Sequence, residues 1–210
     1  MKQQPATVSW VAPTTVELNL PDADISLTSN FVRGDEADAL MSTLLSDIAW
    51  EQRDIRLFGK TFKQPRLIAW HGDPGASYTY SGSRFEPRPW TGSLRWIRDS
   101  VSAATGHPFN SVLLNLYRDG SDSMGMHADD EPELGHNPVI ASVSLGAERV
   151  LTLRHRHLND QPSRRIPLPH GSLLVMRGPT QHHWKHGIAK QRRACGPRVN
   201  LTFRYVSTPR

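Results

Sequence analysis

The 210-residue chain has one cysteine, no long apolar run, no internal repeat and no low-complexity segment. A single cysteine, Cys195, excludes a disulfide within the chain and is typical of a protein kept in a reducing compartment. No apolar stretch approaches the roughly 18 residues that a membrane-spanning helix requires, and the short N-terminal one is broken by Pro13. We therefore expect one domain without a membrane span or signal peptide, in a bacterial cytoplasm or, in a eukaryote, in the nucleus.

Acidic residues are scarce in the last third of the chain. Residues 149–210 hold 13 Lys and Arg against one acid, Asp160, whereas residues 1–148 hold 12 Lys and Arg against 19 acids. This asymmetry favours binding to a polyanion such as nucleic acid. A solvated basic surface on an ordinary soluble protein would have the same composition, so charge alone does not decide between them.

Two helical segments precede a series of strands. Apolar residues recur at helical spacing over 37–48, with Asp35 as the expected N-cap, and a second helix is expected between its cap Thr91 and Gly106. Strands are expected at 112–117, 139–145, 150–156, 172–177 and 198–206. Residues 1–25 lack periodicity and are expected to form an arm. This order predicts an α+β fold whose strands form a sandwich or jelly roll.

The strand 198-RVNLTFRY-205 separates polar from apolar residues. Arg198, Asn200, Thr202 and Arg204 share one face, and the apolar residues share the other. The polar face is either exposed to water or lines a cavity that holds an anion, because guanidinium binds carboxylate in a bidentate manner. By the same alternation, Asn115 and Tyr117 lie together on the strand that leads to residue 124.

Metal-binding residues are suggested by His127-Ala128-Asp129 within 124-MGMHADDEPELGH-136. Two histidines and one carboxylate are typical of non-haem iron(II) sites. His-x-Asp alone is a weak motif, and the chain has a second copy, His71-Gly72-Asp73, whose following Pro and Gly suggest a turn. The run 182-HHWKH-186 offers a third ligand, but the spacing does not choose among its three histidines. Up to this point, iron and a satisfied polar turn remain equal alternatives.

Several segments together resemble the AlkB family of iron(II)/2-oxoglutarate nucleic-acid dealkylases, with the animal DNA repair members nearest. The resemblance is carried by 115-NLYRDGSDSMGMHADDE-131, 140-IASVSLGAER-149, 170-HGSLLVMRGPTQHHWKHGI-188 and 197-PRVNLTFR-204, with 57-LFGK-60, 65-PR-66, 78-YTYSG-82 and 107-HPFN-110. It spans roughly residues 30–206. It implies a double-stranded β-helix, a jelly roll, as the core over 109–210, with helices and nucleotide-recognition elements over 26–108.

The resemblance also implies the functional residues. His127, Asp129 and His186 would bind iron(II), and His71-Gly72-Asp73 would be a loop. The 2-oxoglutarate residues would be Asn115, Tyr117, Arg198, Asn200, Thr202 and Arg204, with Arg204 pairing with the distal carboxylate. With O2, the enzyme would hydroxylate an N-linked methyl group on a base such as 1-methyladenine or 3-methylcytosine, releasing formaldehyde, succinate and carbon dioxide.

The nucleic-acid contacts implied lie mostly between residues 53 and 82. A base must leave the stack to be demethylated, and Phe58-Gly59 near the tip of a hairpin over 53–63 would fill the gap. The further contacts expected are Lys60, Lys63, Arg66, Tyr78, Tyr80, Ser81 and Asp130. Without the resemblance, Phe58 and the two tyrosines would be taken as core, and Asp130 as a solvated acid.

Three residues depart from the family pattern, namely Lys185, His71 and Tyr80. They affect substrate preference and not the reaction class. We expect a monomer that binds alkylated DNA, with RNA as an alternative. The competing hypotheses are a 2-oxoglutarate oxygenase acting on RNA, a protein or a small molecule, and a nucleic-acid-binding β-helix domain without catalysis.

Overall fold

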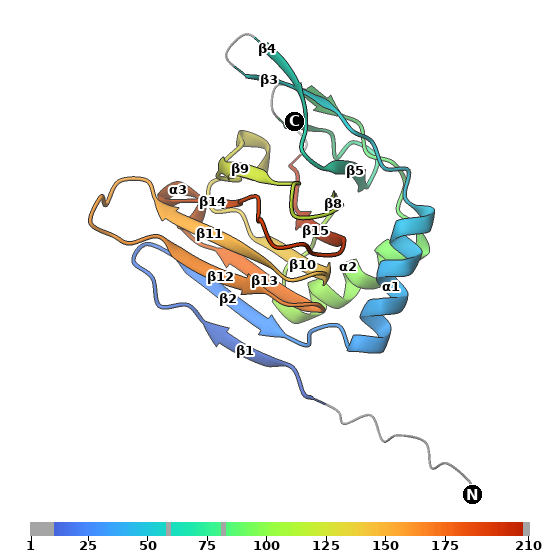
Figure 1. The fold of residues 1–210 in the computed structure, drawn as a ribbon, viewed down its shortest axis with the longest axis horizontal. Coiled ribbons are helices and arrows are strands. Elements are labelled where there is room, and N and C mark those ends of the chain that lie inside the picture. The colour runs from blue at the N-terminus through green and yellow to red at the C-terminus, as the bar shows by residue number, and fades with distance from the viewer. Residues whose placement is uncertain (1–10, 58–59, 81–82, 208–210) are drawn as a thin grey trace, which may run out of the picture.

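The computed structural model describes residues 11–57, 60–80 and 83–207. Within this part of the chain, two antiparallel sheets face each other (Figure 1). The larger sheet has the order β1 (Thr14–Glu17), β2 (Asp24–Ser29), β13 (Ser172–Arg177), β10 (Ile140–Gly146), β15 (Arg198–Arg204), β8 (Ser111–Tyr117) and β5 (Leu67–Gly72). The smaller sheet has the order β12 (Arg164–Leu168), β11 (Arg149–His155), β14 (Trp184–Ile188) and β9 (Met124–His127). The expected jelly-roll architecture is confirmed.

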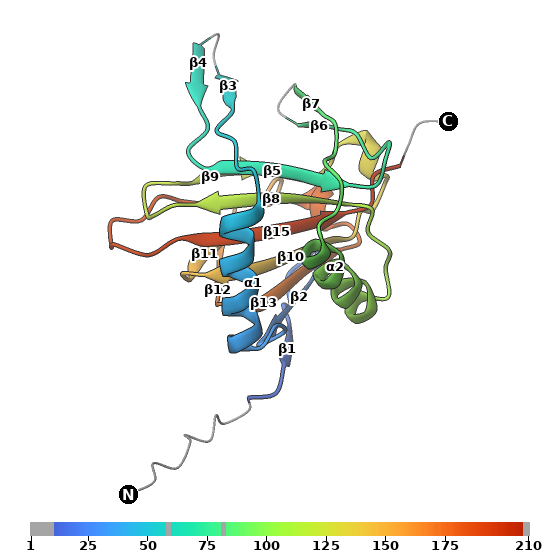
Figure 2. The ribbon, with the colours of Figure 1, turned by 90° about the vertical axis from the view of Figure 1, so that its right-hand side faces the viewer.

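Two helices cover the outer face of the larger sheet, α1 (Gly34–Asp47) and α2 (Gly92–Thr105) (Figure 2). The prediction for α2 is confirmed at both ends. Thr91 Oγ1 accepts a hydrogen bond from the Leu94 N–H at 3.2 Å, and Gly106 ends the helix at φ 66°. The cap predicted for α1 is wrong, because Arg33 is the N-cap and Asp35 lies inside the first turn.

Two apolar cores result from the alternation of side chains along the strands. On β15, Val199, Leu201 and Phe203 pack toward α1 and α2 in the first core. The second core lies between the two sheets and includes Leu113, Leu153 and Trp184. The polar residues of β15 face this inter-sheet space, so the sequence pattern of this strand already determines which side carries the site.

The N-terminal segment differs from the loose arm that the sequence predicts. Thr14–Glu17 form β1 and pair with β2, which in turn pairs with β13 of the larger sheet. β2 and β5 belong to the same sheet as the C-terminal strands, so the jelly roll is not restricted to residues 109–210.

Two hairpins project from one edge of the molecule, next to β5 (Figure 2). They are β3 (Asp54–Leu57) with β4 (Lys60–Lys63), and β6 (Tyr78–Tyr80) with β7 (Ser83–Phe85). The first confirms the hairpin predicted over 53–63. Two short helices complete the described chain: η1 (Pro132–Leu134), a 3-10 helix, and α3 (Thr180–His183). No helix in the described residues is long and apolar enough to cross a membrane.

Candidate active site

Two neighbouring strands of the smaller sheet bring a histidine pair and a carboxylate together. His127 ends β9 and lies opposite His186 of β14 in the strand register, and Asp129 follows two residues after His127. Asp129 Oδ1 lies 3.9 Å from His127 Nε2, and its Oδ2 lies 3.8 Å from His186 Nε2. β9 approaches β14 so closely at Gly187 that a Cβ there would lie 2.9 Å from the Met124 carbonyl oxygen.

The protonation of this cluster suits metal binding. His127 Nδ1 lies 2.9 Å from the Gly125 carbonyl oxygen, so Nδ1 carries the proton and the Nε2 lone pair faces Asp129. Burial lowers the pKa of His186 to about 3. Burial alone would raise the pKa of Asp129, but the charges of Arg204 and the two histidines bring it to about 2. At neutral pH the cluster is therefore a carboxylate with a neutral His186.

One oxygen of Asp129 has a hydrogen-bond donor, and the other has none within the described part of the chain. Oδ1 accepts a hydrogen bond of 2.7 Å from Arg204 Nη2, and the side chain is fully buried. Oδ2 meets no hydrogen-bond donor among the described residues. A buried carboxylate oxygen without a donor is costly, and a cation bound between Oδ2 and the two histidines would satisfy it. The three residues thus fit a 2-His-1-carboxylate metal centre.

A cavity opens beside the cluster, between the two sheets. Its polar wall is the face of β15 predicted from alternation, and its apolar wall comes mainly from the smaller sheet and β13. The polar lining residues are Tyr117, Ser142, Arg198, Asn200, Thr202 and Arg204. The four of these residues that lie on β15 are all buried. The alternative of a water-exposed polar face is therefore excluded for β15.

The two arginines of this wall are placed differently. Arg204 is engaged with Asp129, as described above. Arg198 is 2% exposed and donates from Nη2 to Ser144 Oγ at 2.9 Å, while its Nε and Nη1 meet no acceptor among the described residues. Burial lowers the pKa of Arg198, yet Tyr117 beneath the guanidinium opposes this effect. A buried guanidinium with two unused donors is suited to a carboxylate ligand.

Two expected site residues lie outside the cavity wall. Asn115 Oδ1 accepts a hydrogen bond of 2.7 Å from Arg66 Nε, and Asn115 Nδ2 donates to Asn200 Oδ1 at 3.4 Å. Arg66 is only 4% exposed. Asn115 therefore contacts the cavity through Asn200, and Arg66 extends this hydrogen-bonded group toward the hairpin edge.

The remaining substrate residues are only partly described. Asp130 is half-exposed and forms an ion pair of 2.7 Å with Arg156. Lys60 lies on β4, and Tyr78 and Tyr80 lie on β6, so both hairpins carry residues that the resemblance implies. Phe58, Gly59 and Ser81 lie outside the described residues.

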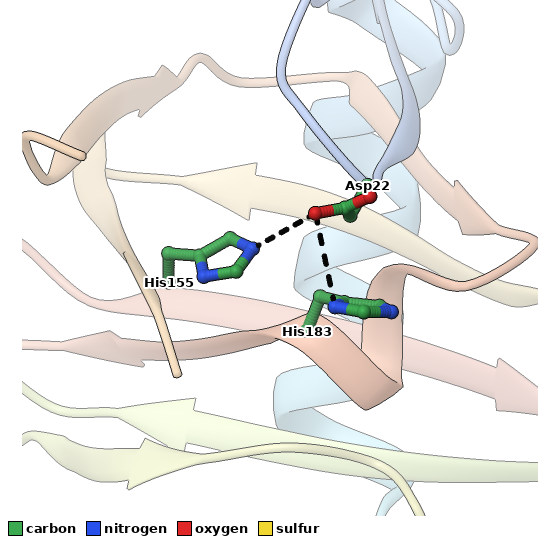
Figure 3. Close-up of side chains that lie close together, drawn as sticks. All are labelled: Asp22, His155 and His183. Atoms are coloured by element: carbon green, nitrogen blue, oxygen red, sulfur yellow. Dashed lines mark hydrogen bonds and ion pairs between the residues drawn. The ribbon is translucent and has the colours of Figure 1, made fainter. Parts of the chain in front are cut away.

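A second cluster of two histidines and a carboxylate lies at the start of β14, where His155 is opposite Trp184. His155 Nε2 is 3.3 Å and His183 Nδ1 is 3.8 Å from Asp22 Oδ2 (Figure 3). Asp22 sits in the turn between β1 and β2 at φ 52°, and next to it Trp184 Nε1 donates to the Pro21 carbonyl oxygen at 2.8 Å. The cluster thus fastens the N-terminal hairpin to β14.

The hydrogen bonds of His155 argue against a metal in this second cluster. Its Nδ1 accepts from the backbone N–H groups of Leu158 at 2.9 Å and His157 at 3.2 Å. Nδ1 is therefore unprotonated, and the neutral ring must carry its proton on Nε2, the atom that faces Asp22. A histidine ligating through Nε2 needs the opposite tautomer. The other His-x-Asp copy, His71-Gly72-Asp73, is not among the clusters of described residues that could hold a metal. Its Asp73 Oδ1 accepts a hydrogen bond of 2.7 Å from Trp90 Nε1.

The comparisons with known proteins agree with the first cluster. The model of the 2OG-Fe(II) oxygenase superfamily matches residues 24–204. The chain belongs to this superfamily. The oxygenase therefore uses iron(II), 2-oxoglutarate and O2, and its His127, Asp129 and His186 are the described residues that fit the iron.

The similar proteins place the oxygenase in the AlkB family. It is 42% identical over 201 residues to human alpha-ketoglutarate-dependent dioxygenase alkB homolog 3, covering 90% of this chain and 70% of that protein. It is 41% identical over 203 residues to human DNA oxidative demethylase ALKBH2, covering 92% and 77%. The Arabidopsis thaliana ALKBH2 is 33% identical over 229 residues, covering 97% and 73%. A solved structure of OsALKBH1 shares the fold, with a TM-score of 0.62 and 16% identity over 94% of this chain and 99% of that one.

Sequence reasoning missed three side chains that support the oxygenase site. Gln181 bonds the backbone of Asp129, Arg156 pairs with Asp130, and Arg149 is buried against the carbonyl oxygens of Asp122 and Ala189. Each acts across a long sequence separation. The spacing within one segment therefore held no sign of them.

Proposed function

We propose that this AlkB-family oxygenase demethylates N-alkylated bases in DNA, of the 1-methyladenine and 3-methylcytosine type. The observation that carries the proposal is the His127–Asp129–His186 cluster beside a cavity in which Arg198 keeps two donors without an acceptor among the described residues. The relatives named DNA oxidative demethylase, 41–43% identical in mammals, give the substrate class. The basic C-terminal third is consistent with a polyanionic substrate.

Iron(II) bound at the cluster would couple the oxidative decarboxylation of 2-oxoglutarate by O2 to hydroxylation of the N-linked methyl group. The hydroxymethyl product then loses formaldehyde, and the nitrogen regains its unmodified state. The protein supplies ligands with fixed orientation, a cavity that excludes bulk water, and the anion site for the cosubstrate.

We assign the distal carboxylate of 2-oxoglutarate to Arg198. The sequence suggested Arg204 for this role, but Arg204 Nη2 already binds Asp129 Oδ1. Arg198 lies on the same face, six residues earlier, and keeps Nε and Nη1 available within the described chain. Asn200 and Thr202 are bonded to each other at 2.9 Å and form the wall between the two arginines. Arg204 then holds the iron-binding carboxylate in place.

On the nucleic-acid side, we propose that the β3–β4 hairpin carries Phe58 into the gap left by the flipped base. Lys60 and Lys63 of β4 are suited to phosphate contacts, and Tyr78 and Tyr80 of β6 to stacking on the base. Asp130 would release Arg156 and accept a hydrogen bond from a base amino group. RNA is the alternative polymer, and its test is the same assay on a matched oligonucleotide.

The test is removal of 1-methyladenine from single- and double-stranded oligonucleotides with iron(II), 2-oxoglutarate and ascorbate. We expect repair by the wild type with formaldehyde and succinate in equal amounts, and none by His127→Ala. Phe58→Ala should reduce repair of duplexes more than repair of single strands. Succinate without repair would contradict the DNA substrate and favour another one. If neither succinate nor repaired base were formed, the better account would be a nucleic-acid-binding domain without catalysis.

A further inference from the structure

The backbone of Asp129 lies outside the strand pairing of the smaller sheet, which ends at His127. β9 ends at His127, the last residue that pairs with β14, and residues 128–131 have no regular secondary structure. The Asp129 N–H therefore has no strand partner, although its residue is fully buried. Leaving a buried backbone N–H unsatisfied is costly, so its acceptor is a specific feature of this site.

That acceptor is a side chain from another part of the chain. Gln181 Oε1 accepts the Asp129 N–H at 2.9 Å, and Gln181 is itself 1% exposed. Gln181 lies on α3, five residues before His186. One continuous segment, α3 followed by β14, thus supplies both the ligand His186 and the side chain of Gln181 that anchors Asp129.

Helix α3 is held firmly enough to act as such an anchor. Thr180 Oγ1 accepts the Asp24 N–H of β2 at 3.0 Å and donates to the Arg177 carbonyl oxygen at 2.5 Å. Arg156 Nη1 donates to the Gln181 carbonyl oxygen at 3.3 Å and also to Asp130 Oδ2 at 2.7 Å. Arg156 therefore ties the helix to the residue that follows Asp129.

Two contacts together determine where the free oxygen of Asp129 points. Arg204 fixes Oδ1, and Gln181 fixes the main chain of the same residue. If only Arg204 remained, the carboxylate could pivot about Oδ1 and Oδ2 would leave the two histidines. The ligand geometry of a metal site depends on such outer contacts, whose loss typically reduces metal affinity roughly 10- to 100-fold.

From this geometry we propose that Gln181 is a positioning residue for the iron-binding carboxylate of Asp129, acting through its backbone N–H. The inference rests on the proposed function in requiring that His127, Asp129 and His186 bind the metal. It adds that an uncharged side chain outside the ligand set determines how tightly and in what geometry the metal is bound.

The test uses cobalt(II) as a spectroscopic probe bound to the metal-free 210-residue chain, without O2 or substrate. Gln181→Met keeps the length of the side chain but removes the acceptor, and Gln181→Asn keeps an amide one methylene too short. Gln181→Glu keeps an oxygen at the same place. His182→Ala is the matched control, because His182 is on the same helix but contacts His136 and Asn137 instead of Asp129.

We expect Gln181→Met and Gln181→Asn to raise the cobalt(II) Kd roughly 10- to 100-fold and to change its visible ligand-field spectrum. Gln181→Glu should restore the spectrum and most of the affinity, and His182→Ala should leave both unchanged. Thermal unfolding of each metal-free variant separates misfolding from loss of affinity, and if the methionine variant does not fold, the asparagine variant decides.

The result that overturns the inference is wild-type affinity and spectrum in both Gln181→Met and Gln181→Asn, or an equal loss in His182→Ala. A different result, in which the wild type itself binds no cobalt(II) and Asp129→Ala makes no difference, would instead remove the proposed metal site and the inference with it. The two failures are therefore distinguishable.

Discussion

The molecule contains two clusters of the same composition, His127–Asp129–His186 and Asp22–His155–His183, in each of which one carboxylate faces two imidazole nitrogens. In the first, the carboxylate is fully buried and Oδ2 has no donor among the described residues. In the second, the aspartate side chain is 48% exposed, and His155 uses Nδ1 as an acceptor for two backbone N–H groups. The two clusters have the same residue types at similar distances. They differ in the burial of the aspartate and in which ring nitrogen of the histidine carries the proton.

This difference shows what a metal site requires beyond a donor set. Each ligand atom needs an unshared lone pair on the side of the ion, and that is fixed by the bond at the other ring nitrogen. His127 meets this condition through Gly125, whereas His155 fails it through His157 and Leu158. The first cluster also opens on a cavity suited to the cosubstrate, whose lining includes none of the residues of the second.

The largest expected effect comes from removing each aspartate in turn. Asp129→Ala should abolish tight cobalt(II) binding and succinate formation, because it removes one ligand and takes from the buried Arg204 the carboxylate that accepts from its Nη2. Asp22→Ala should still bind one equivalent of metal and form succinate at the wild-type rate. Metal titration followed by visible absorbance measures the stoichiometry. Two tight equivalents in the wild type, with one lost in Asp22→Ala, would contradict our comparison.

A second test concerns the cavity that only the first cluster has. Arg198→Met should weaken 2-oxoglutarate binding by about 2–5 kcal/mol, roughly 30-fold or more in Kd, because the distal carboxylate would lose its buried charged partner. Metal affinity should stay unchanged. Calorimetric titration of manganese(II)-loaded enzyme without O2 measures the Kd, and Arg154→Met, on an exposed part of β11, is the matched control. If Arg198→Met left the Kd of 2-oxoglutarate unchanged, the distal carboxylate would have to be assigned to Arg204 instead.

The sequence predicted the site where short-range periodicity was sufficient. Alternation along β15 placed Arg198, Asn200, Thr202 and Arg204 on one face, and the structure confirms that this face lines the cavity. The spacing of His127 and Asp129 suggested two candidate ligands, but the motif is weak and occurs twice, so the choice of His127 and Asp129 rested on the family resemblance. The same pattern could not choose the third ligand, because the chain changes from helix to strand between His183 and Trp184, and this change sends neighbouring histidines to different clusters.

What the sequence could not predict depends on residues that are distant along the chain. Asp22 meets His155 after 133 residues, and Gln181 meets Asp129 after 52, so no local pattern marks either pair. The predicted cap of α1 was wrong for a local reason, since the helix begins one residue before Asp35. β9 and β14 were missed because their short sequences, MGMH and WKHGI, contain glycine and histidine in place of a β-branched run.

The pH dependence of the stability of the metal-free protein tests how burial acts on the first cluster. The pKa of His186 is about 3 in the folded state, below its usual value of 6.5, so between these values only the unfolded chain takes up the proton. Stability is therefore expected to fall as the pH drops below 6.5, and Asp129, with a pKa near 2, adds a further loss below 3.8. Urea unfolding from pH 7 to 5 measures the slope, which His186→Gln should flatten. A slope that His186→Gln leaves unchanged would show that burial of this ring is not its source.

The smallest expected effect is the loss of stability when Asp22 of the second cluster is substituted. Asp22→Asn keeps a residue that tolerates positive φ but weakens the acceptor for His155 and His183, so stability should fall by about 1 kcal/mol, or roughly 2–4 °C in Tm. Asp22→Ala should lose more, because alanine is strained at φ 52°. Calorimetry of the metal-free protein measures both. If zinc(II) raised the Tm of Asp129→Ala but not that of Asp129→Ala combined with Asp22→Asn, the second cluster would bind metal after all, and the tautomer of His155 would have to change on binding.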